Sequence, residues 1–173
     1  MIETERLILR TPEPADRAPL HAMWADPRVM ADLGPVKSTA DSDASLARHA
    51  SYAPLGFRAV VRREDGATIG FCGLKPGAPD TPIADTLEVG WMLAVPYWCH
   101  GYAREAAAAV IAWGWANRSD DAIVAITSRQ NGRSRALMAR LGMVHVPELD
   151  FRHPLFAAED PRADTVTYRI ERP

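Results

Sequence analysis

One α/β domain built around a mixed sheet is the fold class that the sequence predicts, and three observations indicate it. The chain has 173 residues, the size of one ordinary domain, and 47% of them are hydrophobic, enough for a continuous core. Segments with strand periodicity and segments with helix periodicity follow one another along its whole length. No linker, repeat or low-complexity tract interrupts them. We therefore treat residues 1–173 as a single domain.

The N-terminal half is predicted to contain a strand, three helical segments and a β-hairpin. A β-rich run comes first, and a Pro-containing turn leads from it into the helical patterns. Residues 34–42 are expected to form a loop between the last two helical segments. Asp65-Gly66 supplies the positive φ that a hairpin turn requires. The predicted elements are a strand over 6–10, helices over 16–24, 29–33 and 44–53, and strands over 57–62 and 67–74.

The C-terminal half is predicted to alternate strands and helices. Residues 86–95 are apolar on both faces from Val89 onward, which indicates a central buried strand. Pro96 ends this strand, and small apolar residues then recur at helical spacing, which favours close packing of a helix on the sheet. The predicted elements are a strand over 86–95, a helix over 103–117, a strand over 122–127, a helix over 131–141 and strands over 144–146 and 165–170.

Charge and cysteine content exclude several classes of function. The formal net charge is −2 and the charges are scattered, so there is no basic face for nucleic acid and no polybasic run for a membrane surface. The two cysteines, Cys72 and Cys99, cannot form a disulfide framework, and no Cys or His cluster has metal-ligand spacing. No apolar run is long enough for a signal core or a membrane span. We expect a cytoplasmic protein without a bound metal.

The segment from Val95 to Ala103 joins the central strand to a helix through a loop that contains Gly101. Such a junction presents backbone N–H groups at the positive end of a helix dipole, where a phosphate or pyrophosphate binds. Taken alone, one glycine favours a plain strand-to-helix turn over a phosphate site. The Rossmann pattern Gly-x-Gly-x-x-Gly and the Walker pattern ending in Gly-Lys-Ser/Thr are both absent, so neither nucleotide-binding fold is indicated.

Three ordered motifs make the sequence resemble the GNAT superfamily of N-acetyltransferases, in its ribosomal-protein N-terminal acetyltransferase (RimJ/RimL-like) branch. The first is EVGWML over 88–93 running into PYWCHGYAREA over 96–106, which resembles the acetyl-CoA-binding motif. The second is the opening ETERLILR over 3–10. The third is Asn131-x-x-Ser134, followed by LGM over 141–143. The resemblance covers nearly the whole chain.

This resemblance implies a mostly antiparallel sheet, flanked by helices and splayed between the strands 86–95 and 122–127. The pantetheine of acetyl-CoA, the co-substrate, would lie in the gap like an added strand. Its pyrophosphate would lie on the backbone amides of the loop and first helical turn, with Arg104 adding a charge contact. The implied cofactor-binding residues are Met92, Leu93, Ala94 and Val95 on the strand, His100, Gly101, Tyr102, Ala103 and Arg104 at the junction, and Asn131.

The sequence departs from the family pattern at one place. Trp98, Cys99 and His100 stand where the superfamily has Gln or Arg and this branch often has Trp-Gly-Lys. The loss of a basic side chain would weaken cofactor binding, although the backbone donors remain. Cys99 is not required as a nucleophile, because direct transfer to an amine forms no covalent enzyme intermediate.

Acetyl transfer from a thioester to an amine requires a base, an oxyanion donor and a proton for the thiolate. Ser134 shares a helix face with Leu137, so its hydroxyl is expected to point inward, bonded to a backbone carbonyl one turn earlier or to the CoA sulfur as general acid. Glu88 is the candidate base if it is buried; an exposed strand-end Glu and a water chain are the alternatives. Asn131 is expected to cap its helix, contact the cofactor or do both. The oxyanion donor is expected among the amides of 92–94.

The acceptor is expected to be a primary amine, either on a small molecule or at a protein N-terminus. Its pocket is expected from residues 23–33 and 148–164, where Asp150, His153 and Asp160 have no assigned role, and a strongly acidic pocket would favour polyamines. Two other classes stay open: a non-catalytic acyl-CoA-binding or regulatory module, and a structural domain without a cofactor. The resemblance also leaves a homodimer open, but the sequence identifies no interface.

Overall fold

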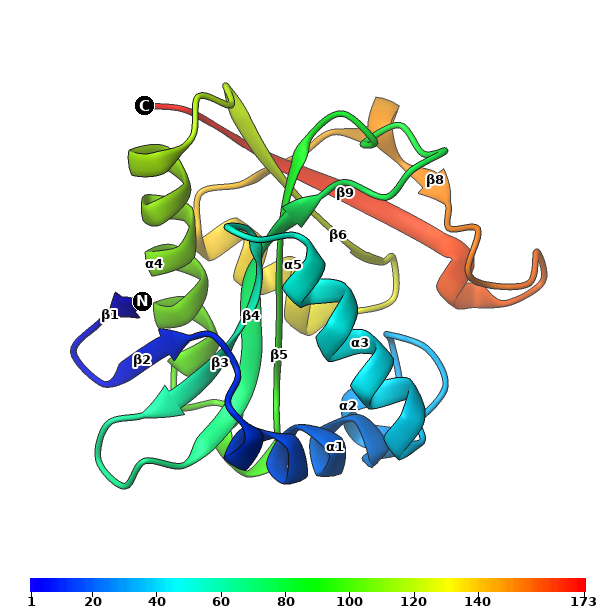
Figure 1. The fold of residues 1–173 in the computed structure, drawn as a ribbon. Helices are drawn as coiled ribbons and strands as arrows, with labels where there is room; N and C mark the ends of the chain where they lie inside the picture. The colour runs from blue at the N-terminus through cyan, green and yellow to red at the C-terminus, as the bar shows by residue number, and fades with distance from the viewer.

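A nine-stranded sheet runs through the centre of the computed structural model, which describes residues 1–173 (Figure 1). The strand order is β1-β2-β3-β4-β5-β6-β9-β7, and β8 pairs with β9. Every pair is antiparallel except β5 with β6, which confirms the mixed, mostly antiparallel sheet. The strands are β1 (Ile2–Glu3), β2 (Leu7–Arg10), β3 (Gly56–Arg62), β4 (Thr68–Pro76), β5 (Leu87–Leu93), β6 (Ala122–Ser128), β7 (Val144–His145), β8 (Phe151–Arg152) and β9 (Asp164–Glu171).

Helices cover both faces of this sheet. In Figure 1, α3 lies at the front, to the right of β4 and β5, while α4 runs along the left side. The α-helices are α1 (Arg17–Ala25), α2 (Pro27–Met30), α3 (Thr39–Ser51), α4 (Tyr102–Asn117) and α5 (Gly132–Arg140). Four short 3₁₀ turns join them to the strands: η1 (Pro14–Asp16), η2 (Val95–Tyr97), η3 (Pro147–Leu149) and η4 (Pro161–Ala163). No helix has both the length and the apolar composition needed to cross a membrane.

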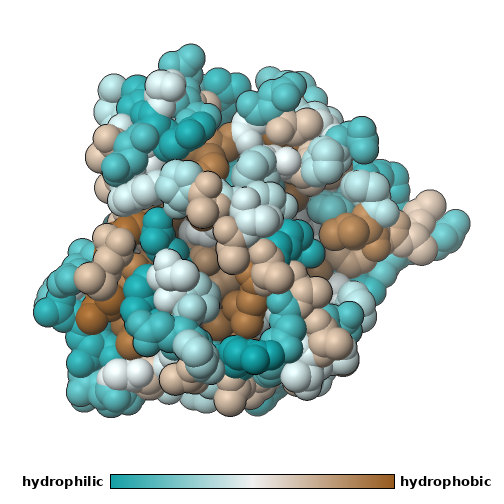
Figure 2. All heavy atoms as spheres, in the orientation of Figure 1, coloured by the Kyte–Doolittle hydropathy of each residue, from teal (hydrophilic) through white to brown (hydrophobic).

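The two faces of the sheet have separate hydrophobic cores, because successive side chains of a strand point to opposite faces. The larger core, of 20 buried residues, packs α4 and α5 against the sheet. The smaller core, of 7, packs α1 and α2 against Phe57 and Phe71. A Cβ at Gly114 would lie 2.8 Å from Leu74 Cδ1, so the predicted close approach of α4 to the sheet is confirmed. Figure 2 shows a mainly polar outer surface, on which apolar side chains show mostly in hollows.

The sheet opens between β5 and β6. Only Leu87 with Ile123 and Glu88 with Val124 are paired across these two strands, although each strand has seven residues. Beyond Glu88, β5 stays paired with β4 as far as Leu93, and β6 stays paired with β9. The expected splay is therefore present. It explains why Gly90, Trp91 and Met92 are half-buried rather than buried, as a closed central strand would be.

The predicted loop over 34–42 is wrong, because α3 begins at Thr39. Ser38 caps the helix by accepting a hydrogen bond from the Asp41 amide, and the Asp41 carboxylate accepts one from the Ser38 amide. This is a reciprocal capping box with Asp in place of the usual Glu or Gln. The short strands β1 and β8 were also not predicted, since two residues are too few to show a strand pattern.

His49 of α3 is buried in an aromatic cluster and is held neutral. Its Nδ1 accepts a hydrogen bond of 3.2 Å from the Phe57 amide, and its ring packs against Phe57 and Phe71. Burial, together with the positive charges of Arg48 and other basic residues, lowers the pKa of His49 to about 3. Because Nδ1 is an acceptor, the imidazole proton lies on Nε2.

The depressed pKa of His49 makes folding sensitive to acid. Below pH about 6.5 the unfolded chain binds a proton at this residue and the folded protein does not, so stability falls as the pH falls. A His49→Asn variant keeps an acceptor for the Phe57 amide but cannot titrate. We expect wild type to lose about 2 kcal/mol relative to His49→Asn between pH 7.5 and pH 5.0, measured by urea unfolding. Equal losses in the two proteins would contradict the assignment.

Candidate active site

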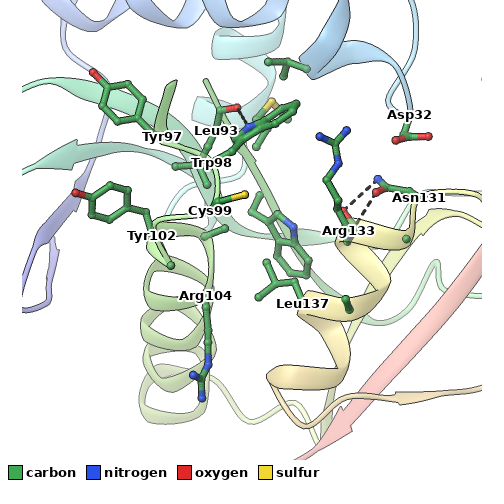
Figure 3. Close-up of a pocket in the computed structure, with 18 of the residues that line it drawn as sticks. Asp32, Leu93, Tyr97, Trp98, Cys99, Tyr102, Arg104, Asn131, Arg133 and Leu137 are labelled. Atoms are coloured by element: carbon green, nitrogen blue, oxygen red, sulfur yellow. Dashed lines mark hydrogen bonds between the residues drawn. The ribbon is translucent and has the colours of Figure 1, made fainter. Parts of the chain in front are cut away.

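A cavity of about 490 Å³ lies where the sheet opens (Figure 3). Its walls come from β5, from the loop and first turn of α4, and from the facing side of α5. In Figure 3, Tyr102 and Cys99 lie on the α4 side, while Arg133 and Leu137 come from α5 on the other. The lining is mainly hydrophobic, with polar groups concentrated at the two helix ends. Such a cavity has the size and composition of a small-molecule site.

The N-terminus of α4 offers a run of free backbone donors. Cys99 and Gly101 have positive φ, 64° and 82°, which turns the chain sharply into the helix. The first helical amides cannot bond within the helix, and the amides of residues 99–104 donate to no other protein group. The nearest atom to a Cβ at Gly101 would be Arg6 Nη2, at 3.4 Å. These donors, at the positive end of a 16-residue helix, have the arrangement that anions bind, and we call them the anion site.

Most of the predicted cofactor-binding residues line this cavity. The residues that do are Met92, Leu93, Gly101, Tyr102, Ala103, Arg104 and Asn131. The structure does not bring Ala94, Val95 or His100 to the lining. The His100 ring lies 2.6 Å from the Trp98 carbonyl oxygen through Nδ1 and stacks on Tyr102. Cys99, which was not predicted as a binding residue, takes the position at the cavity wall instead.

The direction of the β5 backbone groups follows from one hydrogen bond. The Ala94 amide donates to the Ile69 carbonyl at 2.9 Å, so Ala94 faces β4 and its N–H is used. Backbone groups of alternate residues in a strand point to the same side, so Met92 also faces β4, whereas Trp91 and Leu93 face the opening. Of the three amides of 92–94 that were expected to include the oxyanion donor, only the Leu93 amide therefore faces the opening. The Leu93 carbonyl already accepts a bond from Trp98 Nε1 at 2.7 Å.

Three arginines line the cavity without an ion-pair partner: Arg104, Arg133 and Arg140. Only Arg104 was predicted from the sequence. No acidic side chain lies within ion-pair distance of any of them, and Arg133 stacks over the Trp98 ring with its Cζ 4.2 Å from the ring centre. Unpaired guanidinium groups around a helix N-terminus fit a ligand that carries several phosphates. The spacing Arg133 to Arg140, about two helical turns on α5, is the signal that could have indicated this pair.

Asn131 and Ser134 form one unit at the start of α5. Asn131 is the N-cap, as predicted: its Oδ1 accepts from the Ser134 amide at 3.1 Å. Its Nδ2 donates to Thr127 Oγ1 at 3.0 Å and to Ser134 Oγ at 3.1 Å. Ser134 Oγ therefore accepts from Asn131 and does not bond to a backbone carbonyl. Its own proton has no acceptor in the protein and is free to be donated.

Glu88 is buried, so the alternative of an exposed strand-end carboxylate is wrong. It lies opposite Lys75 on β4, and the Lys75 ammonium donates directly to its Oε2. Burial raises the pKa of Glu88, and the Lys75 charge opposes this rise. The effect of burial is the larger of the two, since only 6% of the residue is exposed. Glu88 is also the last β5 residue paired with β6, at the point where the sheet opens.

A second cavity, of about 280 Å³, lies against the first. Glu88 and His153 line only the second, while Asp32 and Ser134 line both. Asp150 and Asp160, named as acceptor-pocket candidates, do not line it. Asp150 accepts hydrogen bonds from the Thr167 amide and from His145, and Asp160 pairs with Arg162. Ser134 therefore stands at the junction of two cavities, with a raised-pKa carboxylate in one and the anion site in the other.

Comparison with known proteins identifies related chains and folds. A family model described as an acetyltransferase (GNAT) domain matches residues 6–144. The uncharacterized protein YkkB of Bacillus subtilis (strain 168) is 26% identical over 144 residues, which are 81% of this chain and 83% of that one. An acetyltransferase from Agrobacterium tumefaciens str. C58 superposes with a TM-score of 0.78 and 26% identity, covering 98% of this chain and 93% of the other.

Two more distant structures were solved with CoA and show the same fold. One is spermidine N-acetyltransferase from Vibrio cholerae in complex with CoA and spermine, with a TM-score of 0.77 and 16% identity over 98% of this chain and 97% of that one. The other is RimL, a ribosomal L7/L12 α-N-protein acetyltransferase in complex with CoA, with a TM-score of 0.78 and 13% identity over 97% and 95%. No group of three or more potential metal-ligating side chains lies together in this structure.

Two substitutions separate the capping of α5 by Asn131 from its side-chain hydrogen bonds to Thr127 and Ser134. Asn131→Ala removes both the cap and the bonds to Thr127 and Ser134, whereas Asn131→Ser keeps a capping oxygen. We expect Asn131→Ala to cost about 1–2 kcal/mol of unfolding free energy and Asn131→Ser to recover about half of it, measured by chemical unfolding. Equal stability of Asn131→Ala and wild type would show that the cap is dispensable.

Proposed function

The chain belongs to the GNAT acetyltransferase family, and from that premise we propose that it transfers the acetyl group of acetyl-CoA directly to a primary amine, in a ternary complex at Ser134. The observation that carries this proposal is the position of Ser134 at the junction of the two cavities, between the anion site and Glu88. The protein is an N-acetyltransferase, and a cytoplasmic location is part of the same proposal.

The first cavity suits the donor, acetyl-CoA. The free amides at the start of α4 would hold its pyrophosphate, and Arg104, Arg133 and Arg140 would neutralise its phosphate charges. The backbone groups of Trp91 and Leu93, which face the opening, would pair with the amides of its pantetheine arm. These donors replace the basic loop side chain that the sequence lacks at Cys99 and His100.

The chemistry would use three groups of the chain. The Glu88 carboxylate takes a proton from the acceptor ammonium, and the neutral nitrogen attacks the thioester carbonyl carbon. The Leu93 amide donates to the oxygen that becomes negative. As the new C–N bond forms and the C–S bond breaks, the Ser134 hydroxyl gives its proton to the departing thiolate sulfur. The second proton that the nitrogen loses passes to solvent, Ser134 regains a proton from solvent, and Glu88 releases its proton to solvent before the next turnover.

The same groups favour turnover over the non-catalytic alternative. A buried carboxylate with a raised pKa costs stability, and a binding module would gain nothing from it. The spermidine and ribosomal-protein acetyltransferases share this fold at 16% and 13% identity, which carries over no acceptor. A small-molecule amine and a protein N-terminus are therefore both compatible with the fold alone.

The proposal is tested by acetyl-CoA binding and amine-dependent thiol release. At acetyl-CoA about a hundredfold above Kd we expect about 2.7 kcal/mol of stabilisation, a rise in Tm on the order of 5–10 °C. With a panel of amines, Glu88→Gln should lower kcat by about 10²-fold or more. It should also remove the loss of activity that wild type shows as the pH falls through the raised pKa of Glu88.

The control for this experiment is Glu148→Gln, which changes an exposed carboxylate on η3. It should keep wild-type kcat and the wild-type pH profile, and Ser134→Ala should lower kcat while acetyl-CoA still stabilises the protein. No stabilisation at saturating acetyl-CoA would sink the proposal. If acetyl-CoA stabilises the protein but Glu88→Gln keeps the wild-type pH profile, Glu88 is not the base, and a water chain remains as the candidate.

A further inference from the structure

The second cavity has an excess of positive charge. Besides His49 and His153, whose pKa values burial lowers, its ionisable lining comprises the basic side chains Lys37, Arg48, Lys75 and Arg162 and the carboxylates Asp32 and Glu88. Lys75 is paired with Glu88, and Arg162 is paired with Asp160. None of the other three, Lys37, Arg48 and Asp32, has an ion-pair partner in the chain. The cavity is thus not the strongly acidic pocket that a polyamine would require.

Lys37 is placed with its ammonium at this cavity. Its Nζ donates to Ser45 Oγ at 2.5 Å and lies 5.6 Å from the centre of the Trp24 ring. Ser45 in turn donates to the Asp41 carbonyl, so the hydroxyl that receives Lys37 is fixed. A half-buried ammonium with only a neutral hydroxyl as its hydrogen-bond partner still has two free donors. The Asp41 carboxylate favours the charged form of Lys37 but makes no ion pair with it.

Arg48 lies close enough to Lys37 for the two charges to repel. Burial lowers the pKa of Lys37, and the Arg48 charge lowers it further. The positive charges of Arg48, Lys75 and Lys37 also act on His49, where they help to lower its pKa and keep the ring neutral. Its Nε2 proton is one more donor at the same cavity. An anion placed here would relieve the repulsion and fill the donors.

Asp32 is the one carboxylate of the second cavity without an ion-pair partner. Asp32 lines both cavities, as Ser134 does, so its carboxylate lies on the side where acetyl transfer is proposed. An ammonium approaching Glu88 would pass this carboxylate. The cavity therefore has a negative group on the transfer side and two free cations on the α3 side, which matches a zwitterion.

We propose that the acceptor is a small amine that carries a carboxylate or phosphate on the same molecule, with the anion bound by Lys37 and Arg48 and the amine directed to Asp32 and Glu88. This inference rests on the proposed function. A volume of about 280 Å³ fits a molecule of amino-acid size. Aromatic side chains, Trp24, Phe57, Trp91 and Phe156, form part of the wall and would pack against its apolar portion.

The phosphates of the donor do not account for these cations. The loop amides and the three arginines of the first cavity serve that charge, and neither Lys37 nor Arg48 lines the first cavity. The two cations belong to α3 and the segment before it, on the Glu88 side of Ser134. Their role therefore concerns the acceptor.

The experiment compares matched pairs of amines that differ in the anionic group. The pairs are phenylalanine and phenylalaninamide, 6-aminohexanoate and hexylamine, and phosphoethanolamine and ethanolamine, with spermidine as a polycation. For each compound, kcat/KM is measured by thiol release, and binding to the CoA-loaded protein is measured by calorimetry. We expect at least one anionic member to exceed its neutral partner by about tenfold or more in both measurements. The pair that shows this difference identifies the preferred anion as a carboxylate or a phosphate. It also gives the preferred distance between the anion and the amine.

Two pairs of variants assign this preference to the cations. Lys37→Met and Arg48→Met should each lower kcat/KM for the anionic amine by about tenfold and leave the neutral partner unchanged. Lys37→Arg and Arg48→Lys keep the charge and should keep most of the preference. All four should keep the acetyl-CoA stabilisation of wild type, which separates this test from a failure of the proposed function.

The proposal is overturned by any of three results on protein that acetyl-CoA stabilises. Neutral amines or spermidine could be bound and acetylated as well as the anionic compounds. None of the anionic compounds could bind at all. The anionic preference could also persist undiminished in Lys37→Met and Arg48→Met, which would place the anion elsewhere.

Discussion

The opening of the sheet after Glu88 is the constraint on which the rest of the site depends. Two parallel strands that separate leave backbone N–H and C=O groups unpaired in the middle of a domain, and such groups are costly unless something bonds to them. Here the Trp98 indole satisfies the Leu93 carbonyl, while the Leu93 amide still faces the gap. The gap also allows α4 and α5 to present their N-termini to one cavity. An extended ligand with amides of its own would complete the sheet.

The two cavities that meet at Ser134 differ in the charged groups that line them. The donor side combines a helix N-terminus with unpaired arginines, and the other side combines the Glu88–Lys75 pair with Asp32, Lys37 and Arg48. Burial penalises the charged form of Glu88, so the same desolvation that destabilises this carboxylate gives it a proton affinity useful to a base. Asn131 holds Ser134 between the two regions through a cap that also contributes to the stability of α5.

The fold and the donor site could largely be predicted from the sequence because local patterns specify them. The apolar run through Val89, the Gly101 turn and the Asn131 cap each depend on neighbours within a few residues. The start of α3 at Thr39 was missed because Asp41 completes the capping box where Glu or Gln is the familiar residue. The burial of Glu88 could not be read from a strand end, since it depends on Lys75 thirteen residues earlier, on the neighbouring strand. Lys37 and Arg48 could not be assigned to the second cavity from the sequence, because it is the packing of α3 that brings them there.

The most direct test of the central claim is hydrogen exchange at individual amides, measured by NMR with and without saturating CoA. If the ligand enters the gap as an added strand, the Trp91 and Leu93 amides and the amides of 101–104 should become protected together, while Met92 and Ala94, already paired with β4, should change little. Protection of the 101–104 amides alone would support phosphate binding at the start of α4 but contradict binding of the ligand as an added strand. Unchanged exchange at all of these amides under saturating CoA would contradict the account of the site.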